Sequence, residues 1–269
     1  GFLGRAELWL MECTFEDCFG DDAGGAVWIG CVSPVGNSLN YFSMEGGHFR
    51  RCTSGAEGGA VYHGDAVVNL KNVVFEDCQS AKGGALNFNR PCPQFPMHII
   101  TEMLTRGMIE DQSLPYIRLS NCTFTRCRAT GAAPLGGGAA WLTSGYNVLV
   151  EDSSFTNCTA GFAGAIGSVA DASIKLTVRR SIFRRCSSTG YSGVLGMYGE
   201  ANVYDSHFIE CSGAYGGVAD LISPIKFTML GGSVIRARFI EQGVRGARQG
   251  SGRAAARFGS QGSRVRGQG

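Results

Sequence analysis

The sequence is short of charge and of proline, and it has no long apolar run. Only 17% of its 269 residues are charged, and the net charge is +2. Chains that are disordered throughout combine low hydrophobicity with high net charge, so a chain with 44% hydrophobic residues is expected to fold. No apolar run approaches the ~18 residues of a membrane-spanning helix. Seven prolines without a Gly-X-Y period exclude collagen.

The two ends of the sequence lack other features. Gly1–Arg5 has neither a Met nor a basic stretch followed by apolar residues, so no signal peptide is visible and we expect a piece or a processed form of a larger protein. From Gly243 to Gly269 there are six Arg and no acid, which leaves 1–242 at +2 − 6 = −4. The composition of this Arg/Gly-rich segment, which has almost no apolar residues to bury, predicts a disordered tail. Three interpretations of this segment remain open. It is a solvated linker, or it is translated from sequence beyond the true end of the coding region, or it is a tail that binds RNA. Nucleic-acid binding is the least favoured.

What the sequence does have is an internal repeat of Phe-x-x-Cys followed by a cluster of small residues. The seven pairs are Phe15/Cys18, Phe49/Cys52, Phe75/Cys78, Phe124/Cys127, Phe155/Cys158, Phe183/Cys186 and Phe208/Cys211. The clusters contain Gly24-Gly25, Gly58-Gly59, Gly83-Gly84, Gly137-Gly138, Gly164, Gly193 and Gly216-Gly217. In each cluster the last Gly is followed by Ala or Val. The residue after that is Val, Leu or Ile, except after Gly138 and Gly217, where it is Ala. We interpret Phe239 with Gln242 as an eighth, degenerate copy.

The repeat predicts a solenoid of short β-strands. Successive Phe residues lie 25 to 49 residues apart, and the shortest spacings suit one coil of about three strands. Helical repeats have similar periods, but these units contain Gly pairs and β-branched residues without a 3.6-residue period. Ser173–Arg179 alternates apolar and polar residues as a half-buried strand does. We therefore predict an all-β, single-stranded right-handed parallel β-helix of about eight coils over 1–242.

Stacking at about 4.8 Å places equivalent residues of successive coils in ladders. Phe and Cys three residues apart cannot face the same side of a flat strand, so a bend is expected between them, with both side chains inside. The Gly clusters are expected at a second corner, where Gly permits positive φ or close backbone approach. If Gly59 has a positive φ, Gly59→Val is strained, whereas Ser80 is expected in a variable loop.

The Gly-Gly-Ala-(Ile/Leu/Val) clusters with Phe-x-x-Cys resemble the chlamydial polymorphic outer membrane proteins, in which Asn occupies the position of this Cys. They are also similar to pectin-lyase-like right-handed β-helix proteins. The resemblance covers roughly Phe15 to Gln242. It implies a cell-surface or secreted location and adhesin-like binding of an extracellular glycan or protein ligand.

One segment interrupts the repeat at about 87–118. Arg90–Pro96 is rich in turn formers. Met97–Gln112 then carries apolar residues at helical spacing, so we expect a short helix packed outside the coil or a protrusion that binds a partner.

Eleven cysteines leave at least one unpaired within the chain. A ladder of free thiols is the favoured interpretation, ahead of some disulfides and of metal binding, because no Cys-x-x-Cys occurs. Asn121 and Asn157 match the glycosylation sequon.

The sequence contains no motif that predicts a catalytic, cofactor-binding or metal site. Asp21-Asp22 is similar to the paired acids of β-helix polygalacturonases, but the other motifs of those enzymes are missing and a solvated turn is favoured. The acids before Cys, such as Asp17 and Asp77, are expected simply to face outward. The sequence thus favours a non-enzymatic binding scaffold, with a polysaccharide lyase or hydrolase as the alternative.

Overall fold

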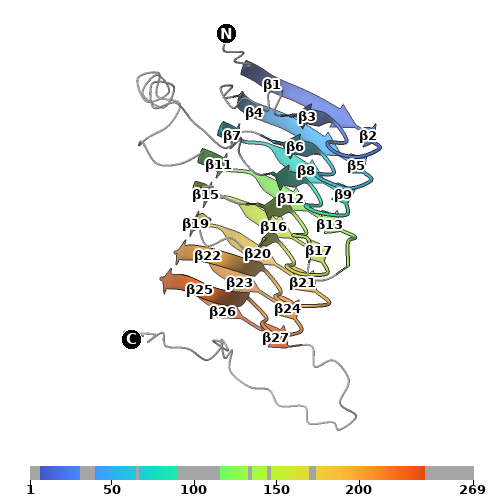
Figure 1. Ribbon diagram of the computed structural model, residues 1–269. Coiled ribbons are helices and arrows are strands. Elements are labelled where there is room, and N and C mark those ends of the chain that lie inside the picture. The colour runs from blue at the N-terminus through green and yellow to red at the C-terminus, as the bar shows by residue number, and fades with distance from the viewer. Residues whose placement is uncertain are drawn as a thin grey trace.

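The chain folds as a parallel β-helix (Figure 1). The computed structural model describes residues 7–30, 40–64, 67–89, 116–132, 135–143, 147–169 and 174–239. These ranges contain strands and turns and no helix, and the strand pairings among them are parallel. The predicted all-β solenoid is therefore confirmed. The helix expected at 97–112 and the tail at 243–269 lie outside the described residues.

Each coil contains four short strand segments rather than the three expected. A five-residue segment is followed by a bend, a three-residue segment that carries Phe, a second bend, a two-residue strand, the small-residue cluster, and a last segment of three or four residues. The coils span 7–29, 41–63, 67–88, 116–142, 147–168, 175–198, 200–222 and 226–239, and we number them coil 1 to coil 8. Coil 8 ends within the described residues after its two-residue strand.

The strands follow this order along the chain. The first segments are β7 (Val67–Lys71), β11 (Tyr116–Ser120), β15 (Asn147–Glu151) and β19 (Lys175–Arg179). The Phe-carrying segments and their counterpart in coil 8 are β8 (Val74–Glu76), β12 (Thr123–Thr125), β16 (Ser154–Thr156), β20 (Ile182–Arg184), β23 (His207–Ile209) and β26 (Ser233–Ile235). β1 (Glu7–Glu16) and β4 (Tyr41–Arg50) run through the first bend and contain both segments.

The remaining strands complete the coils. The two-residue strands form one eight-stranded sheet from β2 (Phe19–Gly20), β5 (Thr53–Ser54), β9 (Gln79–Ser80), β13 (Arg128–Ala129), β17 (Thr159–Ala160), β21 (Ser187–Ser188), β24 (Ser212–Gly213) and β27 (Arg238–Phe239). The last segments are β3 (Val27–Ile29), β6 (Val61–His63), β10 (Leu86–Phe88), β14 (Ala140–Leu142) and β18 (Ile166–Ser168). β22 (Leu195–Tyr204) and β25 (Ala219–Leu230) continue from the last segment of one coil into the next coil.

A stack of phenylalanine rings runs along the inside of the solenoid. The repeat places Phe at the same register position in coils 1 to 7, and neighbouring rings lie 4.6–5.1 Å apart between centroids and within 11° of parallel. The six rings from Phe49 to Phe208 are completely buried, whereas Phe15 in coil 1 is only partly buried, contrary to expectation. Offset stacking of this kind adds to the burial of apolar area.

Two bends in each coil turn the backbone through the left-handed region. One lies three residues before Phe and the other two residues after it. Within the described residues, fourteen non-glycine residues have positive φ, and all lie at these bends. Six are at the first bend and eight at the second, with φ between 45° and 57°. The second bend brings Phe and Cys to the same interior, as expected from their spacing. The first bend was not predicted, because its occupants range from Asn72 and Asp152 to Arg180.

The Gly clusters keep the coils close together, but the two glycines act differently. Gly24, Gly58 and Gly83 have φ of 62–68°, whereas the equivalent Gly137, Ala163, Ser192 and Gly216 do not have positive φ. The later coils therefore accept Ala and Ser at this position. Gly59 does not have a positive φ and instead has the other role expected of these glycines, the close approach of neighbouring backbones. A Cβ added there would overlap the carbonyl oxygen of Gly84 in the next coil.

The eighth copy of the repeat lies elsewhere than expected. Phe208 pairs with Val234, not with Phe239, so Val234 and Ala237 occupy the positions of Phe and Cys in coil 8. Phe239 instead pairs with Gly213 in the sheet of two-residue strands. The spacing from Phe208 to Val234 is 26 residues, the same as that from Phe49 to Phe75, and Val keeps an apolar side chain in the stack.

The interruption of the repeat is shorter than the expected range of 87–118. β10 extends to Phe88 and β11 begins at Tyr116, and these two strands belong to consecutive coils. Ile117 pairs with Val68 in the coil before it. The solenoid therefore continues in register across the inserted segment.

Gly59→Ala is expected to destabilise the fold by about 1–3 kcal/mol, the usual cost of overpacking, because the new methyl group overlaps the backbone of the next coil. Ala56→Val, in the exposed turn three residues earlier, is the matched control. Ser80 is unsuitable, because it is buried in β9 and donates hydrogen bonds to the carbonyls of Lys82 and Gly83. Urea unfolding of the two variants measures the difference, and equal midpoints would contradict the steric role of Gly59.

Candidate functional site

The outer side of the second bend carries a column of charged residues. We call it the corner ladder; its members, from coil 1 to coil 8, are Asp17, Arg51, Asp77, Arg126, Asn157, Arg185, Glu210 and Arg236. Arg51 lies 2.6 Å from Asp17, and Arg126 lies 2.7 Å from Asp77, measured from Nε to Oδ1. Acids and bases of successive coils thus pair along the solenoid. The sequence of a single coil predicted only that these acids face outward, because their partners belong to the neighbouring coils.

These contacts fix the charge state of the carboxylates. The side-chain hydrogen bond from Arg51 lowers the pKa of Asp17, and that from Arg126 lowers the pKa of Asp77. Glu76 accepts hydrogen bonds from Arg50 and Arg126, which lower its pKa as well. Each exposed pair is worth little alone, typically below 1 kcal/mol. Their common effect is to keep the acids ionised and neutralised by the neighbouring coil.

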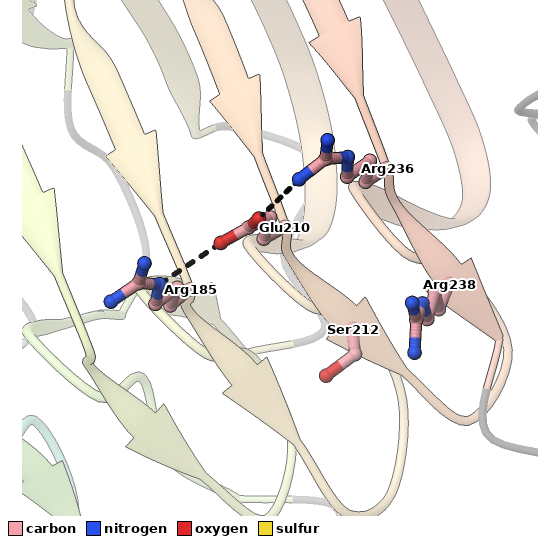
Figure 2. A pocket seen from close by; sticks show the side chains of 5 residues that line it. All are labelled: Arg185, Glu210, Ser212, Arg236 and Arg238. Atoms are coloured by element: carbon pink, nitrogen blue, oxygen red, sulfur yellow. Dashed lines mark hydrogen bonds and ion pairs between the residues drawn. The ribbon is translucent and has the colours of Figure 1, made fainter.

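The ladder opens into a shallow depression at coils 6 to 8 (Figure 2). It has a volume of about 450 Å³ and is lined by Arg185, Glu210, Ser212, Arg236 and Arg238. Glu210 bridges two arginines, with Oε2 2.9 Å from Nε of Arg185 and Oε1 3.0 Å from Nη1 of Arg236. Arg238 makes no ion pair within the described residues. Three guanidinium groups against one carboxylate give the depression a positive charge, which favours anionic ligands.

Aromatic side chains cover the outside of the last segments of the coils. Trp141 and Phe162 are buried there edge to face, with centroids 5.8 Å apart, although they lie outside the tube. Gly167 and Gly196 leave the space they fill, since a Cβ at either position would overlap these rings. Tyr191, Tyr198 and Tyr215 extend this cluster toward solvent, and we call them the tyrosine patch.

Tyr215 is the most exposed member of the tyrosine patch, at 62%. Tyr191 and Tyr198 lie against Phe162 and are partly exposed. Aromatic rings with a free face and a hydroxyl group suit contacts with sugar rings, because they combine apolar surface with a hydrogen-bonding tip. The patch belongs to coils 6 and 7, two of the three coils that line the depression.

The cysteines of the repeat form an interior ladder of free thiols. The nine described cysteines form no disulfide, and those of coils 2 to 7 at the second bend are completely buried; Cys31 and Cys92 lie outside the described residues. Each buried thiol donates to the carbonyl of Phe in the preceding coil, as Cys158 does to Phe124. Its sulfur also accepts a hydrogen bond from the backbone of the preceding Cys, for example Cys158 from Cys127.

Cys18 departs from the predicted ladder of enclosed thiols. It occupies the Cys position of coil 1, but it is only partly buried, because no coil covers it on its outer side within the described residues. Its thiol therefore has no Phe carbonyl of a preceding coil to contact, and it donates to the carbonyl of Glu16 in its own coil, 3.6 Å away. The backbone N–H of Cys18 still donates to the sulfur of Cys52. The expectation of an interior position is thus wrong for Cys18, although its backbone keeps the ladder's hydrogen bond.

Burial makes Cys122, Cys127 and Cys186 poor nucleophiles. Desolvation raises the pKa of Cys127 and Cys186, and it raises the pKa of Cys122 to about 12. A thiol must lose its proton to react or to bind metal. No group of His, Cys, Asp and Glu in the described ranges is arranged to hold a metal ion.

The first bend has a second interior ladder, made with oxygen. The hydroxyl of Ser153 accepts the backbone N–H of Cys122, and the hydroxyl of Ser181 accepts that of Ser153. Ser206 continues the series by accepting the N–H of Ser181. Serine thus does at the first bend what cysteine does at the second.

The remaining residues singled out from the sequence do not converge on one site. Asp21 and Asp22 are exposed in the turn after β2. Asn121 and Asn157 are exposed at the first and second bend, both with positive φ, which Asn adopts more readily than most residues. Asn121 donates its amide to Asn72 of the preceding coil, 2.8 Å away. The sequons therefore coincide with positions at which the bends favour Asn.

Comparison with known proteins found no matching family model, no matching curated protein and no matching solved structure. The part of the chain that the structure describes contains no helix of the length and apolarity needed to cross a membrane.

Cys158→Ala is expected to destabilise the fold by about 1–3 kcal/mol, the cost of leaving a buried backbone donor unsatisfied, because the N–H of Cys127 loses its acceptor. Cys158→Ser should retain most of the stability, since a hydroxyl fills the same role at the first bend. Thermal unfolding of the two variants tests this, with Thr156→Ala on the outer face as control. If the Ala and Ser variants are equally stable, the thiol only fills space.

His63 gives the fold a defined pH dependence. It is completely buried in β6, and desolvation lowers its pKa from 6.5 to about 3. The unfolded chain binds a proton near pH 6.5 and the folded chain does not, so stability is present above that pH and is lost as the pH falls toward 3. Between pH 7.5 and 5 the urea midpoint should fall, and His63→Leu should remove most of this fall. His48→Leu, at an exposed position of β4, should leave it unchanged; an equal slope in the His63 variant would contradict the assignment.

Proposed function

We propose that this chain is a non-enzymatic binding scaffold, located at a cell surface or secreted, that binds a glycan or protein ligand in the manner of an adhesin. The observation that carries the proposal is the outer surface of coils 6 to 8. There the positively charged depression and the tyrosine patch offer the two kinds of contact by which proteins bind sugars that carry acidic groups. Fold alone does not imply this function.

The charge of the depression selects among ligands. Arg238 is free of carboxylate partners within the described residues, and Ser212 beside it offers a hydroxyl group. Guanidinium groups bind carboxylate and sulfate groups through paired hydrogen bonds. An acidic glycan therefore suits this surface better than a neutral one, and the binding depends on ionic strength.

The electrostatics favour binding over glycoside cleavage. A glycosidase needs a general acid whose pKa is raised. The shifted carboxylates among the described residues, including Glu76, Asp77 and Glu210, have lowered pKa values, because arginine or another hydrogen-bond donor holds each of them ionised. Burial of the thiols also suits an oxidising extracellular setting, since protonated, inaccessible thiols resist oxidation.

Binding of the immobilised chain to polygalacturonate, heparin and neutral dextran tests the proposal. The acidic glycans should bind and dextran should not, and affinity should fall as salt rises. The double variant Arg236→Ala/Arg238→Ala should weaken binding at least fivefold, and Tyr215→Ala should weaken it without changing its salt dependence. Arg128→Ala is the matched control, because Arg128 occupies in β13 the register position that Arg238 occupies in β27.

Three results would overturn the proposal: equal binding of dextran, an equal loss in the Arg128 variant, or no binding of any glycan or protein ligand. Release of reducing ends or of unsaturated uronides from polygalacturonate would favour the polysaccharide-active enzyme instead.

A further inference from the structure

None of the described residues covers the outer face of coil 1, although that face carries apolar residues of the interior columns. β1 pairs only with β4 within the described residues, so one side of a ten-residue strand is an open edge. Leu10, Cys13 and Phe15 are partly exposed, whereas their partners in β4 are buried. Met11 and Phe19 are 74% and 69% exposed. An edge of this kind is a template for a further strand.

Coil 8 presents the opposite open face. Its segments, 226–230 of β25 and β26, pair only with coil 7 within the described residues. Phe227, Met229 and Val234 point to the interior ladders but are only partly buried. Leu230 is 58% exposed. The described solenoid therefore has two uncovered ends, which Figure 1 shows at β1 and at β25–β27.

The two faces match position by position when the strand register is continued. Following the pairings from coil to coil places Phe227 in the column of Leu8, Met229 in that of Leu10 and Val234 in that of Phe15. Outside the tube, Leu230 shares the column of Met11. Coil 8 laid on coil 1 would thus give Leu8, Leu10, Met11 and Phe15 apolar partners. Phe19, in the sheet of two-residue strands, shares its column with Arg238.

The charges of the two faces are opposite. Residues 7–30 contain six acids and no base, whereas 226–239 contain three bases and no acid. Arg236 ends the corner ladder at coil 8, and Asp17 begins it at coil 1. Placing Arg236 over Asp17 would repeat the pairing of Arg51 with Asp17. Likewise Lys226, which pairs with Glu200, shares its column with Glu7.

We propose that coil 8 of one copy of this chain stacks in register on coil 1 of a second copy, so that copies associate head to tail. The contact continues the parallel ladder and joins an acidic face to a basic one. Such a contact is heterologous, and it leaves a free coil 1 face and a free coil 8 face on each assembly. The assemblies are therefore linear, and their length grows with protein concentration.

Sedimentation velocity over a concentration series, with the chain as it exists, tests the stacking. The expected result is a distribution of oligomers that shifts to monomer on dilution and at high salt. Two charge-reversed variants probe the two faces, Glu7→Lys/Asp17→Lys on coil 1 and Lys226→Glu/Arg236→Glu on coil 8. Each alone should be monomeric, because the stacked faces then place like charges opposite each other in both reversed columns, 7 against 226 and 17 against 236. An equimolar mixture should associate again, because opposite faces are once more available.

The matched control is Glu45→Lys/Lys71→Glu, which reverses an ion pair between coils 2 and 3 and should leave association unchanged. Met11→Lys adds a variant at a side chain that is mostly exposed, so its melting temperature should stay the same while the dissociation constant rises at least tenfold. A chain that is monomeric at all concentrations overturns the proposal. So does association that survives both reversals, or a mixture of the two variants that fails to associate.

Discussion

The structure depends on satisfying the backbone donors that the bends turn toward the interior. A left-handed residue between two short strands directs the next N–H into the tube, where no water is available and an unpaired donor is costly. The sulfur of cysteine at the second bend and the hydroxyl of serine at the first accept these donors from the preceding coil. With the bends satisfied, the Phe rings can stack and the Gly clusters can bring the coils together. The spacing between coils is therefore set by backbone and side chain jointly.

Much of this fold was predictable from positions at which packing or steric contact allows only one residue type. Phe at a fixed distance from Cys predicted a bend with both side chains inside, and Phe155 and Cys158 are placed in this way. The second Gly of each cluster recurs without exception from Gly25 to Gly217, and from Gly25 to Gly193 it is required by a carbonyl oxygen of the next coil. Steric limits of this kind leave a clear trace in a sequence.

The features that were missed are those that many residue types can satisfy or that depend on a neighbouring coil. The first bend accepts residues as different as Glu12, Arg180 and Gly46, so no single residue type marks it in the sequence. The eighth copy was misplaced, since Val234 fills the interior without reproducing the motif. Cys18 carries the full motif and is still only partly enclosed, because its burial depends on a second coil above it. The arginines of the depression come from coils 6 and 8, with Glu210 of coil 7 between them, and meet only through the stacking register.

The alternation of sign in the corner ladder has a consequence for how such a solenoid lengthens. A charge pattern that alternates from coil to coil repeats every two coils, so duplication of a single coil would place like charges on neighbouring bends. Duplication of a pair of coils would keep every acid beside a base. The one uncharged member of the column, Asn157, stands between Arg126 and Arg185 at the place of an acid, and the alternation has the same phase on both sides of it. The order of charges over the eight described coils is thus the order that duplication of coil pairs would leave.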